Sequence, residues 1–257
     1  MALLEGRDLH KHYGALRALD GVSLSISDGE FLSVIGPNGA GKTTLVNVLT
    51  GLLRPQAGHV YFNGREITGL GPQKLARLGI ARSFQLIHIF PELTVVETLL
   101  AAVMSRTRKS ARLYASLTGD REVNREAREI AALFGLDKNL RAKAGNLSQG
   151  DKKLLDVASA FGLHPEVILL DEPTSGVSTS EKHRIMDTLV SASRSIKTKA
   201  IIQVEHDMDI VFSYSHRILA MHEGRILFDG RPSDLKRNED VVATVMGRKD
   251  VFTTLKR

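Results

Sequence analysis

The sequence predicts an α/β fold with a mostly parallel sheet, an antiparallel β subdomain and an inserted helical subdomain. Three short apolar runs, residues 31–35, 167–170 and 200–204, contain few or no polar residues. Such runs are typical of parallel strands that are covered on both faces. Residues from about 90 to 165 are instead helical in character, which indicates an insertion between the strands.

The first thirty residues predict β structure. Short apolar runs are separated by Gly14, Gly21 and Gly29, and residues 22–26 alternate between apolar side chains and serine. This alternation favours a half-buried strand, and the glycines favour turns. Residues 58–64 indicate a further strand that ends in a turn.

The remaining elements follow from capping residues and helix breakers. The predicted elements are a short helix near 72–78, a strand over 80–85, and helices that begin at 94–97, near 121, at 147–151 and at 178–181. Residues 94–97, Thr-Val-Val-Glu, have the pattern of a capping box. Gly162 and Pro165 stop the helix that begins at 147–151.

The composition is ordinary for a soluble globular protein, with 42% hydrophobic and 25% charged residues among 257. The absence of cysteine excludes disulfides and thiolate metal sites. The amino terminus shows no signal pattern and no apolar run is long enough to span a bilayer, so we expect a cytoplasmic protein. The net charge of +6 leaves room for an anionic partner, but the most basic segment, residues 106–112, lacks aromatic residues that stack on bases. We expect no nucleic acid.

Residues 36–44 carry the strongest functional signal. They fit the phosphate-loop pattern G-x-x-x-x-G-K-[ST] at every fixed position, between a predicted strand and a predicted helix. The residues expected to bind the nucleotide here are Gly36, Pro37, Asn38, Gly39, Ala40, Gly41, Lys42, Thr43 and Thr44. Glycine lets backbone amides approach phosphate at the positive end of a helix, and Lys42 can reach the β- and γ-phosphates. The Thr43 hydroxyl suits Mg²⁺, and Thr44 is placed to contact the next phosphate back. An ordinary turn needs no Lys-Thr ending, so the loop predicts binding of a nucleoside triphosphate.

Asp171 and Glu172 end the apolar run at 167–170. Two unpaired carboxylates in an apolar setting would cost several kcal/mol, on roughly the scale known for buried ions. A magnesium–phosphate group would give them partners. Asp171 suits the metal, through water, and Glu172 suits orienting or deprotonating an attacking water.

Gln85 and His206 each follow a predicted strand, at the edge where open α/β sheets bind ligands. The Gln85 amide can meet a metal ion or a water, although a lone glutamine is normally a surface residue. A strand-end histidine is often a plain surface residue too. Because both lie at the same edge as Asp171, we interpret His206 as a γ-phosphate contact.

Three further features have two interpretations each. Tyr13 can stack on a nucleobase or lie in the core. Ser148, with Asp151 three residues later, can be a local helix cap or part of a second anion site. The apolar loop at residues 86–90 can pack on the helical insertion or dock a partner.

Together these residues resemble an ATP-binding cassette (ABC) ATPase, the nucleotide-binding subunit of a membrane transporter. The resemblance covers residue 4 to about 230. Gln85 matches the Q-loop, residues 147–151 the signature motif, and residues 167–172 the Walker B strand with its catalytic glutamate. His206 matches the switch histidine and Tyr13 the adenine-stacking aromatic residue.

The resemblance implies a P-loop NTPase core in an ABC ATPase domain over residues 1–235, with the helical subdomain inserted at about 90–165 and a tail at 236–257. It implies ATP and Mg²⁺, with Thr43, Gln85 and Asp171 at the metal. A head-to-tail dimer with a second cassette would bring Ser148, Gln149 and Gly150 to the partner's ATP. Membrane-spanning permease subunits, and indirectly a solute-binding protein, are the other implied partners, at the cytoplasmic face of the inner membrane.

Two motifs depart from the family pattern. The usual signature Leu-Ser-Gly-Gly-Gln here has Gln149 for the first glycine and Asp151 for the glutamine, and Ser178 stands where the D-loop usually has aspartate. Residues 79–85 and 204–208 resemble the branched-chain amino acid uptake group. Urea or amide importers, lipopolysaccharide-export ATPases and a cytosolic regulator of translation or DNA repair stay as alternatives.

Overall fold

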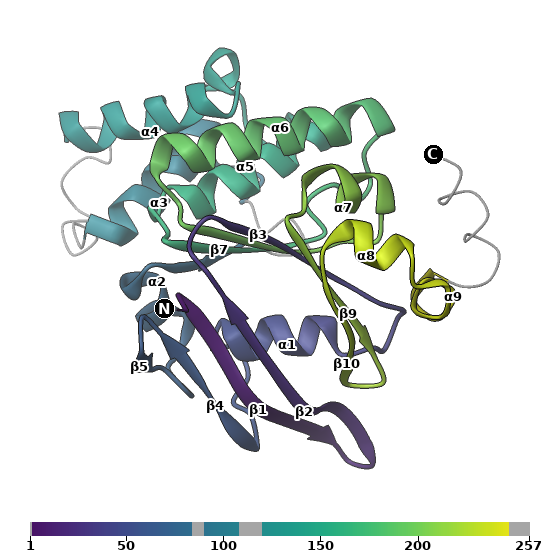
Figure 1. Ribbon diagram of the computed structural model, residues 1–257. Coiled ribbons are helices and arrows are strands. Elements are labelled where there is room, and N and C mark those ends of the chain that lie inside the picture. Colours follow the sequence, from purple (N-terminus) through teal and green to yellow (C-terminus); the bar gives the residue numbers. More distant parts are fainter. Residues whose placement is uncertain (1, 84–89, 108–119, 247–257) are drawn as a thin grey trace. The chain divides into compact units, whose positions relative to one another are not determined.

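The computed structural model describes residues 2–83, 90–107 and 120–246 (Figure 1). The chain forms two compact units. The first comprises Met1–Leu75 and Lys199–Arg257, and the second comprises Ala76–Thr198. The short helix α2 (Pro72–Leu78) contains the division between them.

An antiparallel sheet makes up the amino-terminal part of the first unit. Its strands, in spatial order, are β2 (Leu16–Ile26), β1 (Leu4–Tyr13), β4 (Ala57–Phe62) and β5 (Arg65–Glu66). In β2 the apolar residues Val22, Leu24 and Ile26 are buried, whereas Ser23 and Ser25 are exposed. The expected alternation is therefore confirmed, and it fixes which face of β2 meets the core.

A second group of strands in the first unit is mainly parallel. Strand β3 (Glu30–Ile35) lies between β8 (Ala200–Val204) and β9 (Arg217–His222) and is parallel to both. Strand β10 (Arg225–Gly230) pairs with β9 in the antiparallel sense. All residues of β8, and all of β3 after Glu30, are buried, as expected for parallel strands covered on both faces.

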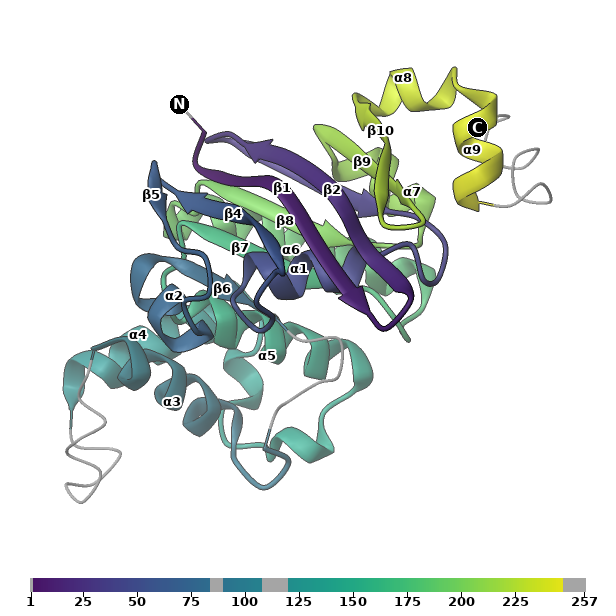
Figure 2. The same cartoon turned by 90° about the horizontal axis from the view of Figure 1, so that it is seen from below.

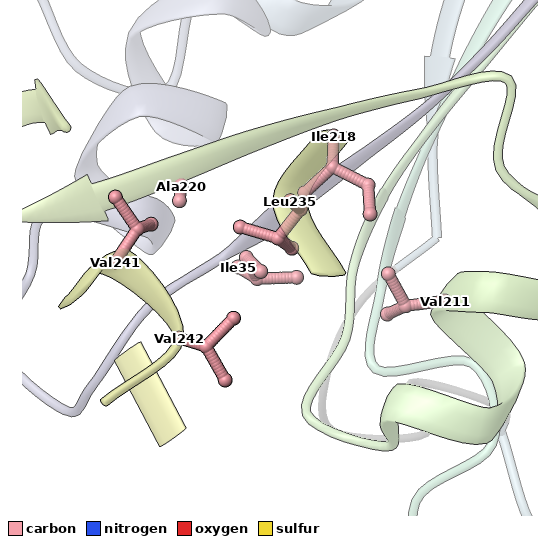
Figure 3. Close-up of a cluster of buried hydrophobic side chains, with 7 residues drawn as sticks. All are labelled: Ile35, Val211, Ile218, Ala220, Leu235, Val241 and Val242. Atoms are coloured by element: carbon pink, nitrogen blue, oxygen red, sulfur yellow. The ribbon is translucent and has the colours of Figure 1, made fainter. Parts of the chain in front are cut away.

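The carboxyl-terminal helices of the first unit pack on this sheet. They are α7 (Met208–Tyr214), α8 (Pro232–Lys236) and α9 (Glu239–Met246), and Figure 2 shows α8 and α9 beside β9 and β10. One buried cluster joins them to the end of β3 (Figure 3): Ile35, Val211, Ile218, Ala220, Leu235, Val241 and Val242. The strand that enters the phosphate loop is thus anchored by helices that come much later in the chain.

The second unit contains the helices predicted between the strands. Its parallel pair is β6 (Ile80–Arg82) with β7 (Val167–Asp171). Its helices are α3 (Val95–Thr107), α4 (Arg121–Leu133), α5 (Gln149–Phe161) and α6 (Thr179–Ile196), with short 3-10 turns at Asp137–Asn139 and Ala144–Asn146. Helix α3 packs against α4 and α5, and α5 packs against α6 and both strands.

Side chains cap the starts of α3 and α4, and the first of these caps was predicted. At α3, the Glu97 carboxylate accepts hydrogen bonds from the Thr94 backbone (2.8 Å) and hydroxyl (2.7 Å), which confirms the capping box. These hydrogen bonds lower the pKa of Glu97. At α4, Asp120 accepts from the backbone N–H groups of Glu122 and Val123.

In the described part of the chain, no helix is long and apolar enough to cross a membrane.

Candidate functional site

The phosphate loop lies between β3, which ends at Ile35, and α1 (Lys42–Leu49). Close backbone packing requires glycine at two of its positions, Gly36 and Gly41. A Cβ atom on Gly36 would lie 2.3 Å from the Met221 carbonyl oxygen in β9, and one on Gly41 would lie 2.2 Å from the Ala18 carbonyl oxygen in β2. Because two strands fix the two ends of the loop, its shape depends on tertiary packing as well as on the glycines.

Lys42 and the first turn of α1 give the loop its positive character. The Lys42 ammonium is buried and donates to the carbonyl oxygens of Gly36 (2.7 Å) and Pro37 (2.9 Å). The first turn of α1 contains no acidic residue, so nothing on the helix offsets its positive end. Thr43 is exposed and Thr44 is half-buried.

His206 lies in the turn that joins β8 to α7, beside the strand that enters the loop. Glu205, only 3% exposed, accepts hydrogen bonds from the backbone N–H groups of His206 (2.9 Å) and Asp207 (3.3 Å). The Glu205 backbone N–H in turn donates to the Val34 carbonyl oxygen of β3 at 3.4 Å. The structure therefore places the turn of His206 and the phosphate loop at the carboxyl ends of two neighbouring strands.

Tyr13 ends β1 in the same unit, and 48% of its surface is exposed. The Lys11 ammonium lies 5.7 Å from the centre of its ring and donates to the Arg54 carbonyl oxygen at 2.9 Å. Tyr13 is thus not a core residue. An exposed ring of this kind can stack on a base.

Asp171 lies in the second unit, as the last residue of β7, and is 1% exposed. Its Oδ2 accepts a hydrogen bond from Arg82 Nη2 at 2.7 Å. Its Oδ1 is buried and has no hydrogen-bond partner among the described residues. A buried carboxylate oxygen without a partner is unfavourable, so this atom favours a cation or a cation-bound water nearby.

Glu172 follows with a backbone φ of 50°, a left-handed conformation that a glutamate rarely adopts. Its carbonyl oxygen accepts hydrogen bonds from the Ser175 backbone N–H (3.1 Å) and the Lys153 ammonium (3.1 Å). The side chain is half-buried. The turn after β7 therefore fixes the direction in which Glu172 leaves the strand.

Ser148 caps α5, since its hydroxyl accepts a hydrogen bond from the Asp151 backbone N–H at 3.1 Å. This confirms the interpretation of Ser148 as a local cap, and its role as an anion site stays a prediction. Ser148 and Gln149 are exposed and Gly150 is buried. A Cβ atom on Gly150 would lie 2.8 Å from Oε1 of Glu181, so a larger residue would displace the end of this side chain where α5 contacts α6.

Two of the three residues that depart from the family pattern, Asp151 and Ser178, contact α6 or its first turn. Asp151 pairs with Arg184 of α6 at 3.4 Å. Ser178 forms a capping box at the start of α6, in which its hydroxyl donates to the Glu181 carboxylate at 2.7 Å. This hydrogen bond is the main cause of a lowered pKa at Glu181. Asp151 and Ser178 thus each add a polar contact at the start of a helix, α5 and α6 respectively.

The candidate residues belong to both units of the chain. Tyr13, the phosphate loop and His206 belong to the first, whereas Asp171, Glu172 and residues 148–150 belong to the second. Gln85, and the docking loop at 86–90 except Phe90, lie outside the described residues.

Three residues near the site were missed by the sequence analysis: Arg82, Lys153 and Glu205. Arg82 and Glu205 each follow a short apolar run, Lys153 directly precedes one, and all three are nearly buried. In α5, Lys153 lies at the same helical phase as Gly150 and Val157, both of which are buried. A charged residue on the apolar face of a helix was the sequence signal that could have identified Lys153.

Comparison with known proteins agrees with this geometry. The sequence profile described as "ABC transporter" matches residues 19–175, which include the phosphate loop, Asp171 and Glu172. The chain belongs to the ABC transporter family. It is accordingly an ATP-binding and ATP-hydrolysing cassette with the α/β fold of the P-loop NTPases.

Individual relatives in the family match almost end to end. The chain is 35% identical over 252 residues to the high-affinity branched-chain amino acid transport ATP-binding protein LivG of Salmonella typhimurium, covering 95% of this chain and 98% of LivG. The ADP conformation of an ABC transporter cassette superposes with a TM-score of 0.82, at 31% identity, over 100% of both chains. A dimeric cassette bound to ADP and Pi in a post-hydrolysis state gives 0.75 at 25% identity, over 89% of this chain and 98% of that one.

Proposed function

We propose that this chain powers the uptake of branched-chain amino acids by hydrolysing ATP at the cytoplasmic face of the plasma membrane. The carrying observation is the buried, half-paired carboxylate of Asp171 followed by the constrained Glu172, in a chain that also has a complete phosphate loop. The similarity to LivG over nearly the whole length of both chains supports the substrate class.

ATP binding is assigned to residues 36–44 and Tyr13. The amides of the loop and the Lys42 ammonium receive the phosphates, and the exposed Tyr13 ring stacks on adenine. His206 contacts the γ-phosphate from the turn after β8. The support is the position of that turn and of the loop at the ends of adjacent strands β3 and β8.

Mg²⁺ is assigned to Thr43, Asp171 and Gln85. Hydroxyl, carboxylate and amide oxygens are the ligands that this cation prefers, and it is usually held by one or two carboxylates plus substrate phosphates. Oδ1 of Asp171 fits such a role, directly or through water, because Arg82 already occupies Oδ2. When bound, the ion neutralises charge on the phosphates.

Glu172 is assigned to the attacking water. Its carboxylate orients the water or accepts its proton while the bond to the γ-phosphate breaks, so that ATP and water become ADP and phosphate. Support comes from the fixed backbone of Glu172, because a general base acts efficiently only when it is held in one position relative to the water.

A second cassette is proposed to complete each site. Ser148, Gln149 and Gly150 at the start of α5 would contact the γ-phosphate bound by the partner chain. Ser148 and Gln149 are exposed at a helix start, where an anion is favoured, and the dimeric relative shows that such cassettes associate. ATP would then favour only the closed dimer, and its hydrolysis would release it.

The remaining partners are proposed to be permease subunits and, indirectly, a solute-binding protein. The segment from Gln85 to Pro91 is the proposed contact with the permease, and its described end, Phe90, is 68% exposed. We also propose the boundaries given above: an ABC ATPase domain over residues 1–235, a helical subdomain at about 90–165 and a tail at 236–257.

Reconstitution tests the proposal. The chain is co-purified with its candidate permease subunits, placed in liposomes with the solute-binding protein, and assayed for uptake of labelled leucine. We expect ATP-dependent uptake, and none with Glu172→Gln in place of the wild-type chain. Uptake of urea or amides instead, transfer of lipopolysaccharide, or hydrolysis without any transport would contradict the substrate class and favour the corresponding alternative.

A further inference from the structure

The turn after β7 holds Glu172 in a conformation that its own sequence does not favour. Its φ of 50° lies in the left-handed region, which glycine adopts readily and glutamate does not. Such a conformation persists only where surrounding contacts enforce it. The contacts that enforce this conformation therefore affect where the Glu172 carboxylate lies.

Lys153 of α5 supplies two of these contacts. Its ammonium lies 3.1 Å from the Glu172 carbonyl oxygen and 3.0 Å from the Ser175 hydroxyl. Ser175 also donates its backbone N–H to the same Glu172 oxygen at 3.1 Å. Lys153 therefore bridges Glu172 and Ser175, the first and last residues of the turn. The turn's own backbone hydrogen bond joins the same two residues.

The burial of Lys153 makes these contacts costly to replace. The residue is 5% exposed, and its neighbours in the same phase of α5 are buried too. A buried ammonium needs several polar partners, and the carbonyl and hydroxyl oxygens of the turn are among those it has. An apolar side chain here would pack in the helix but would leave the Glu172 turn without this bridge.

We propose that Lys153 is a positioning residue that fixes the backbone of Glu172 and thereby aims its carboxylate at the attacking water. The proposal rests on the function proposed for Glu172. Lys153 lies on the same helix as Ser148 and Gly150, which are proposed to face the partner's nucleotide. Helix α5 thus connects Ser148 and Gly150, proposed to contact the ATP bound by the partner chain, to Glu172, proposed to act on the ATP bound by this chain.

The rate of hydrolysis and the ATP-dependent association of two chains together distinguish a positioning role of Lys153 from a role in binding or folding. Loss of the bridge should lower the rate of hydrolysis without changing how ATP brings two chains together. A plot of turnover per chain against protein concentration at saturating ATP measures both, because the midpoint reports association and the plateau reports chemistry. The melting temperature reports the fold.

The test uses Lys153→Met, Lys153→Arg and the control Lys152→Met in the full chain. Lys152 is the half-exposed neighbour on the same helix, so its replacement removes an equal charge. We expect Lys153→Met to lower the plateau about tenfold to a hundredfold, the range that a small misplacement of a catalytic group produces, with an unchanged midpoint. Lys153→Arg should recover most of the plateau, and Lys152→Met should match the wild type.

A wild-type plateau with Lys153→Met, or a shifted midpoint with an unchanged plateau, would overturn the proposal. If Lys153→Met does not fold, Ser175→Ala carries the test, because it removes one end of the bridge and keeps the charge. That variant should lower the plateau at an unchanged midpoint, and a wild-type plateau would contradict the bridge.

A Glu172→Gln background separates this proposal from the function on which it rests. There, Lys153→Met should change the residual turnover by less than about twofold, because the carboxylate that it positions is already gone. An equal loss in both backgrounds would show that Lys153 acts elsewhere. Wild-type turnover in Glu172→Gln alone would instead remove Glu172 from its proposed role, whatever Lys153 does.

Discussion

The phosphate loop and the turn after β7 hold their functional groups in different ways. The loop is fixed by backbone packing, since Gly36 and Gly41 lie against carbonyl oxygens of neighbouring strands. The turn is fixed by buried charged side chains, because Arg82 pairs with Asp171 and Lys153 bridges Glu172 and Ser175. Backbone packing leaves a glycine motif that any reader of the sequence can recognise. Side-chain support leaves only single charged residues whose partners cannot be recognised from the neighbouring sequence.

The largest expected effect is on catalysis at the turn. Glu172→Gln should lower ATP turnover by about 10²- to 10⁴-fold, the usual contribution of a general base, while nucleotide affinity stays near the wild-type value. The two measurements are steady-state hydrolysis with Mg²⁺ and binding of a fluorescent ATP analogue. A variant that loses affinity instead would assign Glu172 to binding, and the contrast with the loop would fail.

Removal of Arg82 tests whether charge supports the second region. Arg82→Met should destabilise the fold by about 3–5 kcal/mol, because it leaves the buried Asp171 carboxylate without its cation. Urea unfolding of the variant and the wild type gives the difference.

The control for that experiment is the same change in an Asp171→Asn background. In that background a neutral amide replaces the carboxylate, so Arg82→Met should cost much less than in the wild type. Equal costs in the two backgrounds would mean that Arg82 stabilises the fold through other contacts.

A matched pair of glycines tests the first region. Gly41→Ala should destabilise the protein by about 2–4 kcal/mol, because the new Cβ would clash with a backbone carbonyl 2.2 Å away at a φ of 102°. Gly39 has a φ of 81°, but no atom lies within 4 Å of the position that a Cβ would take there. Gly39→Ala should therefore cost only about 1–2 kcal/mol of backbone strain. Denaturant unfolding of both variants measures the difference, and equal losses would show that strand packing adds nothing.

The smallest effect concerns pH, to which the charged second unit should respond. His164 lies 2.9 Å from Glu126, which also pairs with Arg106 at 2.6 Å. Burial and Arg106 lower the pKa of His164 below its usual 6.5, and Glu126 opposes them. Between that lowered pKa and about 6.5, the unfolded chain binds a proton that the folded chain does not, so stability rises with pH.

We therefore expect the free energy of unfolding to decrease as pH falls below about 6.5 toward the lowered pKa of His164, and His164→Gln to remove part of this decrease. Urea unfolding of the two proteins at several pH values in this range checks the prediction. A parallel pH dependence in both would assign the effect to another group.

The fold class and the phosphate loop were predictable because both rest on local patterns. Apolar runs marked β3, β7 and β8, and serine alternation marked β2. The capping boxes at Thr94 and Ser178 marked two helix starts. These signals work because periodicity and caps depend on neighbours in sequence.

The supporting residues were not predictable in the same way. Nothing in the sequence connects Arg82 with Asp171, 89 positions later, or Met221 with the glycine at position 36. The sequence also left open whether Tyr13 is buried and whether Ser148 is a cap, which the exposed ring and the hydrogen bond to Asp151 decided. Contacts between distant segments exist only once the chain has folded.

By itself, the sequence determined that this chain binds a triphosphate, because the loop's glycines, lysine and threonines are consecutive and their chemistry is local. Only the tertiary structure decided how Asp171 and Glu172 are held. One oxygen of Asp171 is bound to Arg82 while the other is buried without a hydrogen-bond partner among the described residues, and the Glu172 backbone is bridged by Lys153. The physical reason is burial: a charge removed from water must find partners in space, and those partners come from other parts of the chain.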